Sequence, residues 1–413
     1  MRSLFLQAFL LQLLVRSFLI LQYPHNFAFD GFQRWAGKEQ LLVRDWMPAA
    51  QFFIYCANAL GFDILGTKFI LCVVASFGVA STSLIVAHLF DQKAGHIFIG
   101  FSFFLSFLTW SSTLYQEGTF LALSMSSIAL VLYLPKNKLW IADIVAGSVA
   151  LSRYEGWPFV LLYLFWRKDL KASIALWGMF FWLGIKLLAL PSFAPSPISY
   201  SDWEGLSERF ILRKYLENII SFVTLSSEQG VVWIWFLGLF GFKKAFQKDF
   251  QLSLLLFCLL CSQLLAILGW IAGLETVIHR MYIIPTFLLA IFGSGLSRQW
   301  LILPLFSFGF AFIHTQTSLR YTQFKLYQIK HEILLVEKMN TCLDCRFLVV
   351  PNKELGTRNR HDSCEIIQGI SNMMHPNDFT CELWKPEIDR SLFTHTAQWI
   401  SYQKGYHIRP HQP

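Results

Sequence analysis

Residues 3–22, SLFLQAFLLQLLVRSFLILQ, form an apolar run that is long enough to cross a bilayer as one helix. The loop that follows, residues 23–48, reads YPHNFAFDGFQRWAGKEQLLVRDWMP and mixes charged with aromatic side chains. Aromatic side chains gather at membrane–water interfaces, where their rings sit at the depth of the headgroups. The run therefore predicts a retained first membrane helix, and the loop predicts a polar surface at the edge of the membrane.

The composition extends this interpretation to the rest of the chain. Of the 413 residues, 55% are hydrophobic, 17% are aromatic and only 15% are charged, which is far too apolar for a water-soluble surface. Further runs of crossing or near-crossing length are residues 67–90, 94–112, 118–134, 172–190, 252–272, 281–296 and 301–314. We predict an all-α polytopic membrane protein with about 11 to 13 crossing or half-crossing helices, because helices satisfy their own backbone in lipid.

The formal charge of +8 does not indicate nucleic-acid binding, because the basic residues fall mostly in short turns between apolar runs. If the amino terminus is cytoplasmic, the positive-inside rule requires the basic turns to be cytoplasmic as well. This arrangement is possible only if residues 139–166 cross the membrane twice. That segment is too short for two full spans, so it predicts a bent helical pair. Gly156 and Pro158 would form the break, with its tip on the outer face.

The same topology places the loops 23–66 and 191–230 on the outer face. It also divides the chain into a membrane domain, residues 1–316, and a small extracytoplasmic domain, residues 317–413. A tail of this length, 99 residues from Thr315 to Pro413, suffices for a small domain with a modest core. The tail contains Cys342, Cys345, Cys364 and Cys381, for which two disulfides are favoured over a zinc site in an oxidising compartment.

Charged residues in apolar surroundings are the candidates for function. Asp30 and Arg34 would share a face of an interfacial helix, although such a helix also serves as a membrane anchor. Glu117 begins a predicted span, where the helix dipole alone explains an acid. Arg153 and Glu155 lie two residues apart in an apolar region. They either belong to a functional site or form structural contacts that link the bent tip to neighbouring loops.

Two other arginines are unusual for their positions. Arg16 lies at membrane depth and is expected to face the interior of the bundle or to snorkel, in preference to binding a ligand directly. Arg280, next to His279, opens a predicted helix at the end where the dipole favours acids. An anionic ligand would resolve that conflict.

Three stretches together resemble the GT-C class of integral membrane glycosyltransferases. They are FDGFQRWA at residues 29–36, SRYEGWP at 152–158 and HRMYIIP at 279–285. The likeness is greatest to the bacterial branch similar to the lipid A aminoarabinose and protein O-mannosyl transferases, and it covers residues 1–316. The stretch 153–158 is its most specific part.

The resemblance implies transfer of a sugar, with inversion, from a polyprenyl-phosphate donor to an acceptor hydroxyl or amine of a lipid, glycan or protein. The site would face the outside of a bacterial inner membrane. Asp30 would be the general base and Glu155 a second catalytic acid. Residues implied in substrate or donor-phosphate binding are Arg34, Asp45, Glu117, Arg153, Tyr154, His279 and Arg280.

The resemblance departs from the family at Gly31, which follows Asp30 where many members have a second acid. We therefore expect no metal or other cofactor, with a divalent ion held by Asp30 and Glu117 as the alternative. Two other functions stay open. A ligase would use a lipid-diphosphate donor and would not require Asp30 as base. A lipid-linked sugar transporter or flippase would be expected to show repeated halves, and no repeat is evident.

Overall fold

The structure is a computed structural model, and it describes residues 2–22, 34, 38–42, 47–104, 107–108, 114, 116–188, 216, 220, 232–272, 283–296, 348–351 and 406–409. The chain divides into two compact units. The first comprises Met1–Gln22 with Gln40–Thr317, and the second comprises Tyr23–Glu39 with Ser318–Pro413. The helices described below, α1 to α14, all belong to the first unit.

Helix α1 (Arg2–Gln22) has its polarity reversed relative to a helix of a water-soluble protein. Leu6, Leu10 and Leu14 are 54%, 53% and 69% exposed, whereas Gln12 and Arg16 are completely buried. An apolar outer face with a polar inner face suits a helix surrounded by lipid, because lipid solvates leucine and not guanidinium. The expectation that Arg16 faces the interior is confirmed.

Among the described residues, three helices are long and apolar enough to cross a membrane. They are Arg2–Gln22, Ile64–Leu89 (α4) and Phe250–Leu268, the last within α13 (Phe250–Ala272). They match the predicted runs 3–22, 67–90 and 252–272, and by length and composition they support a helical membrane protein. The larger number of crossings stays a prediction.

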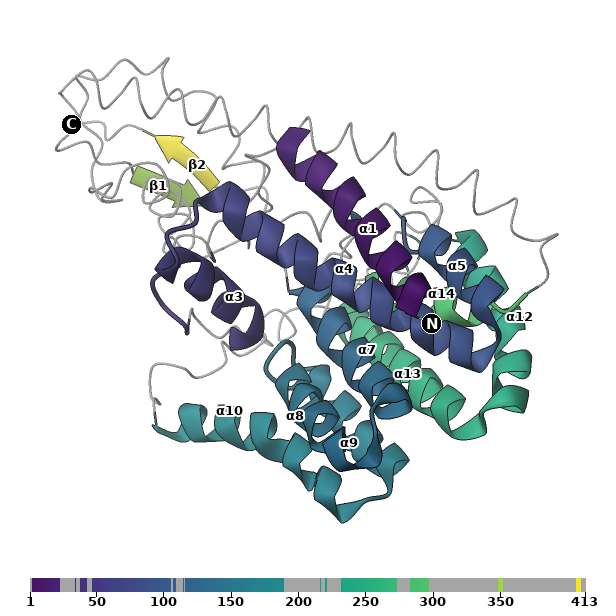
Figure 1. The fold of residues 1–413 in the computed structure, drawn as a ribbon. Helices are drawn as coiled ribbons and strands as arrows, with labels where there is room; N and C mark the ends of the chain where they lie inside the picture. Colours follow the sequence, from purple (N-terminus) through teal and green to yellow (C-terminus); the bar gives the residue numbers. More distant parts are fainter. Residues whose placement is uncertain are drawn as a thin grey trace. The chain divides into compact units, whose positions relative to one another are not determined.

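Helices α4 and α7 (Glu117–Tyr133) pack side by side in parallel. A Cβ on Gly78 would contact the backbone of Ala122, and Ser81 hydrogen-bonds Ser126 through their hydroxyl oxygens, 3.0 Å apart. Small residues let helix backbones approach closely in membranes, where dispersion contacts and hydrogen bonds replace the hydrophobic effect. Helix α1 lies along α4, as Figure 1 shows.

A second close pair consists of α12 (Val232–Lys248) and α14 (Ile283–Gly293). Gly241 lies directly against the carbonyl of Phe292, and the ammonium of Lys244 donates to the Gly295 carbonyl at 2.7 Å, beyond the end of α14. Helix α12 was absent from the predicted runs because lysines interrupt its last turns. The shorter helices α3 (Pro48–Ala59) and α5 (Gln92–Phe101) complete this part of the unit.

The predicted bent pair is present as α8 (Leu139–Val149) and α9 (Gly156–Arg167), which pack together across a turn. The 3-10 helix η1 (Lys136–Lys138) precedes α8. Gly156 begins α9 where a Cβ would collide with the Val149 carbonyl, so the tight break requires glycine. The prediction of a helical hairpin is confirmed, while the side of the membrane that its tip faces stays a prediction.

Two predicted runs differ from the observed helices. In the run 94–112, α5 ends at Phe101, where the Ser102 hydroxyl donates to the Ile99 carbonyl and accepts from Gln12, and residues 107–108 are helical again. The run 172–190 begins as a 3-10 helix, η2 (Leu170–Leu176), before α10 (Trp177–Leu188). The Asp169 side chain accepts from the Lys171 N–H and tightens this start. In both places local side-chain bonds compete with a continuous α-helix.

Gly178 provides a test of the α8–α10 contact. A Cβ at this position would lie well inside contact distance of the Gly147 carbonyl oxygen. We expect Gly178→Ala to destabilise the protein by about 1–3 kcal/mol through overpacking, measured as a lowered unfolding midpoint in detergent. Gly184→Ala in the same helix is the matched control, because nothing lies within 4 Å of its Cβ position. Equal midpoints for the two variants would refute the contact.

In the second unit, β1 (Leu348–Pro351) and β2 (Tyr406–Arg409) form an antiparallel pair, with Leu348 opposite Arg409 and Pro351 opposite Tyr406. The sequence had specified no secondary structure for this region. The cysteines expected to form disulfides, Cys342, Cys345, Cys364 and Cys381, lie outside the described residues, as does the predicted run 301–314.

Candidate functional site

The turn between α8 and α9 carries the first part of the candidate site. The Gly156 N–H donates to the Arg153 carbonyl at 2.9 Å, and the Trp157 N–H donates to the Tyr154 carbonyl at 3.1 Å. These bonds fix the backbone of Arg153 and Glu155 just before α9 begins. The start of α3, within the predicted external loop 23–66, reaches the same turn, because the Ala49 N–H donates to the Leu151 carbonyl at 2.8 Å.

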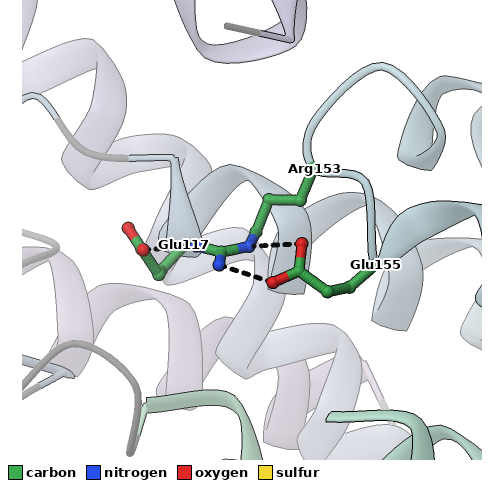
Figure 2. Close-up of polar contacts among 3 residues, drawn as sticks. All are labelled: Glu117, Arg153 and Glu155. Atoms are coloured by element: carbon green, nitrogen blue, oxygen red, sulfur yellow. Dashed lines mark hydrogen bonds and ion pairs between the residues drawn. The ribbon is translucent and has the colours of Figure 1, made fainter. Parts of the chain in front are cut away.

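Arg153 lies between two carboxylates, one from the start of α7 and one from the turn before α9 (Figure 2). Its Nε and Nη2 donate to Glu155 Oε2 and Oε1 at 3.2 and 2.7 Å, which is a bidentate pair. Its Nη1 donates to Glu117 Oε1, 36 positions earlier in the chain. We call Glu117, Arg153 and Glu155 the acid–arginine cluster. Bidentate, charge-assisted bonds of this kind fix orientation as well as adding energy.

The cluster is largely withdrawn from solvent. The side chains of Glu117, Arg153 and Glu155 are 2%, 16% and 20% exposed. Burial of the guanidinium opposes its charge, but the attraction and hydrogen bonds of Glu155 and Glu117 outweigh burial and raise the pKa of Arg153. Arg153 therefore stays protonated as the pH rises, and its ion pairs are not lost through its own deprotonation.

Glu117 has one carboxylate oxygen without a hydrogen-bond donor among the described residues. Its Oε2 is buried and accepts no hydrogen bond within the described part of the chain, and in Figure 2 it points away from Arg153. Glu117 is the first residue of α7, so the helix dipole favours its charge but does not satisfy this oxygen. A buried acceptor without a donor costs about 1–3 kcal/mol. The position is therefore suited to a hydrogen-bond donor from a ligand.

Two neighbouring turns contribute further buried polar atoms. Thr119 Oγ1, in the first turn of α7, and Trp157 Nε1, in the first turn of α9, have no hydrogen-bond partner in the described structure. A hydroxyl accepts and donates, whereas an indole N–H only donates. Groups of both kinds match a ligand that carries several hydroxyls.

The remaining predicted site residues fall in different places. Tyr154 lies in the turn of the cluster and is 49% exposed. Arg34 is described as a buried residue of the second unit, 2% exposed. Asp30, Asp45, His279 and Arg280 lie outside the described residues, so their convergence with the acid–arginine cluster stays a prediction.

Sequence analysis missed a second buried acid. Asp143 of α8 accepts from the Tyr163 hydroxyl at 2.7 Å and from Arg167 Nε at 3.2 Å, both on α9. The signal was available, since a carboxylate within an apolar segment is a candidate by default. All three residues come from the hairpin itself, so this contact ties α8 to α9.

A third polar group lies between α1 and α4. Arg16 donates to the Gln12 side chain and stacks over the Phe107 ring, 4.6 Å from its centroid, while Gln12 donates to the Ser102 hydroxyl at 2.7 Å. Lys68 is also buried, and Arg16 and Lys68 both lie within electrostatic reach of Cys72. These contacts pair Arg16 and Gln12 with polar partners at membrane depth, and two basic side chains, Arg16 and Lys68, lie near the same end of α4.

Within the described ranges, histidine, cysteine and acidic side chains do not gather in a group of three or more that would suit a metal ion. The alternative of a divalent ion between Asp30 and Glu117 depends on a residue outside those ranges. No protein-family model, curated protein or solved structure matches the chain.

Proposed function

We propose that the chain is a membrane-embedded glycosyltransferase of the GT-C type. It moves a sugar, with inversion, from a polyprenyl-phosphate donor to a hydroxyl or amine acceptor on the outer face of the membrane. The observation that carries this proposal is the acid–arginine cluster, and within it the buried, unsatisfied Oε2 of Glu117. Sugar hydroxyls are hydrogen-bond donors of the kind that this oxygen lacks.

In this proposal Glu117 accepts a hydrogen bond from a hydroxyl of the bound sugar. Arg153 acts as a positioning residue, because three of its five N–H donors already bind Glu117 and Glu155. We accordingly assign phosphate binding to Arg280 and, as a second cation, Arg34, in place of Arg153. Their guanidinium groups would stabilise the charge that develops on the leaving phosphate oxygen.

The proton balance of the reaction assigns the base. The acceptor oxygen or nitrogen attacks the anomeric carbon and loses its proton, while the bond from that carbon to the phosphate oxygen breaks. Asp30 takes this proton in the proposal. The lipid phosphate leaves with both electrons of the broken bond, so neither an oxidant nor a further co-reactant is required.

A transfer assay in liposomes with radiolabelled polyprenyl-phosphate sugars tests the proposal. We expect product with the wild type and a loss of about 10²- to 10⁴-fold in turnover for Asp30→Asn, because the amide cannot take the proton. Gln33→Glu is the matched control for a change of charge in the same loop. Undiminished turnover of Asp30→Asn would remove Asp30 as the base.

The choice of lipid-linked sugar donor in this assay also distinguishes the competing functions. Product formed only from lipid-diphosphate donors would indicate a ligase. Movement of labelled lipid across the membrane without a new covalent product would indicate a flippase. Either result would overturn the proposed transfer from a monophosphate donor.

A further inference from the structure

Basic side chains gather where α9 ends beside the beginning of α8. Tyr163 and Arg167 of α9 both reach Asp143, which lies one turn after the first residue of α8. The segment η1 adjoins the start of α8, and η2 packs against both helices. The turns at residues 136–138 and 167–171 are therefore held at the same end of the hairpin.

The charge at this end is mostly uncompensated. Arg167 is paired with Asp143, and the Asp169 side chain accepts from the backbone N–H of Lys171. The exposed lysines at this end, whose ammonium groups have no acidic partner among the described residues, are Lys136, Lys138, Lys168 and Lys171. An anion from outside the chain would be attracted to these four groups.

Apolar side chains are exposed among these lysines. Leu170 is 93% exposed between Lys168 and Lys171, and Trp140 and Ile174 are 53% and 45% exposed. Exposure of a leucine side chain to water is unfavourable in free energy, whereas its contact with hydrocarbon is favourable. The dipole at the end of α9 explains cations at Arg167 and Lys168, yet it explains neither the lysines of η1 nor Leu170.

We propose that this end of the hairpin, which we call the lysine–leucine end, binds the anionic headgroup of a phospholipid. The ammonium groups of Lys136, Lys138, Lys168 and Lys171 contact the phosphate, while Leu170 and Trp140 lie against the acyl chains. Ammonium groups together with apolar side chains match a ligand that is anionic at one end and hydrocarbon at the other. This binding does not depend on the proposed transferase activity.

The test uses the full-length protein in nanodiscs and measures by native mass spectrometry which lipids it retains. Nanodiscs contain equal amounts of phosphatidylglycerol and phosphatidylcholine, which differ in headgroup charge. We expect the wild type to retain phosphatidylglycerol about tenfold over phosphatidylcholine, and K136Q/K138Q/K168Q/K171Q to reduce this preference to near unity. The preference of the wild type should also weaken as salt is raised, because salt screens exposed charges.

Two further variants make the result specific. K93Q/K243Q/K248Q removes lysines from other turns and is expected to keep the preference. Leu170→Ser is expected to reduce retention of both lipids while the preference for phosphatidylglycerol remains. A wild type without preference, or a quadruple variant that keeps it, would overturn the proposal. Displacement of the lipid by millimolar inorganic phosphate would instead show a free-anion site and would equally overturn it.

Discussion

Arg153→Met is expected to destabilise the protein by about 3 kcal/mol, which is typical of removing one partner from a buried ion pair. The substitution keeps an unbranched apolar stem but leaves Glu117 and Glu155 without the guanidinium that they share. Chemical unfolding in detergent, followed by tryptophan fluorescence, measures the loss. The effect should be large because Glu117 is only 2% exposed and cannot be rehydrated in place.

Neutralising the carboxylates separates the cost of unpaired charge from the cost of lost packing. In the background of Arg153→Met, the pair Glu117→Gln and Glu155→Gln is expected to restore most of the stability, since neutral amides tolerate burial better than carboxylates. The same two substitutions in the presence of Arg153 should themselves be destabilising. If the triple variant is no more stable than Arg153→Met, the charges of the cluster are not what stabilises the hairpin tip.

The helices were largely predictable because a helix that crosses a membrane requires a long run of apolar residues, and such a run is visible in the local composition. The run 3–22 matches α1, and the run 252–272 matches α13 to within two residues at its start. Predictions failed where one side chain changes the backbone. The Ser102 hydroxyl forms a hydrogen bond to the backbone at the end of α5, and the Asp169 carboxylate forms one at the start of η2. These hydrogen bonds cannot be predicted from average hydropathy.

The members of the acid–arginine cluster were each predicted as candidates, but their pairing was not. Glu117 and Arg153 come from separate elements, and their contact depends on how closely α7 packs against the hairpin. The resemblance implied an anionic ligand for Arg153, with a tie between the bent tip and its neighbours as the alternative. The structure pairs Arg153 with two carboxylates of the chain itself. Asp143 was missed for a related reason, since its partners Tyr163 and Arg167 become evident only when α9 folds back on α8.

Glu117→Gln is expected to reduce kcat/KM for sugar transfer by about 10²-fold, because loss of a hydrogen bond between a charged group and substrate costs roughly 1.5–3 kcal/mol. The amide oxygen still accepts from Arg153, while the amide nitrogen takes the position of Oε2 and can only donate. The substitution is thus nearly isosteric and acts on the oxygen that the sugar hydroxyl is proposed to bind. Its cost in stability should be about 1 kcal/mol, from weaker bonding to Arg153.

Glu155→Gln is the matched control, since both carboxylate oxygens of Glu155 already accept from Arg153. Our proposal therefore gives Glu155 a positioning role in place of the catalytic role that the resemblance implies. The decisive measurement is kcat/KM of Glu117→Gln and Glu155→Gln side by side, with labelled polyprenyl-phosphate sugar in liposomes. Our account predicts a loss of about 10²-fold for Glu117→Gln and of less than about tenfold for Glu155→Gln. Equal losses, or unchanged transfer by Glu117→Gln, would contradict the claim that the buried oxygen of Glu117 contacts the sugar.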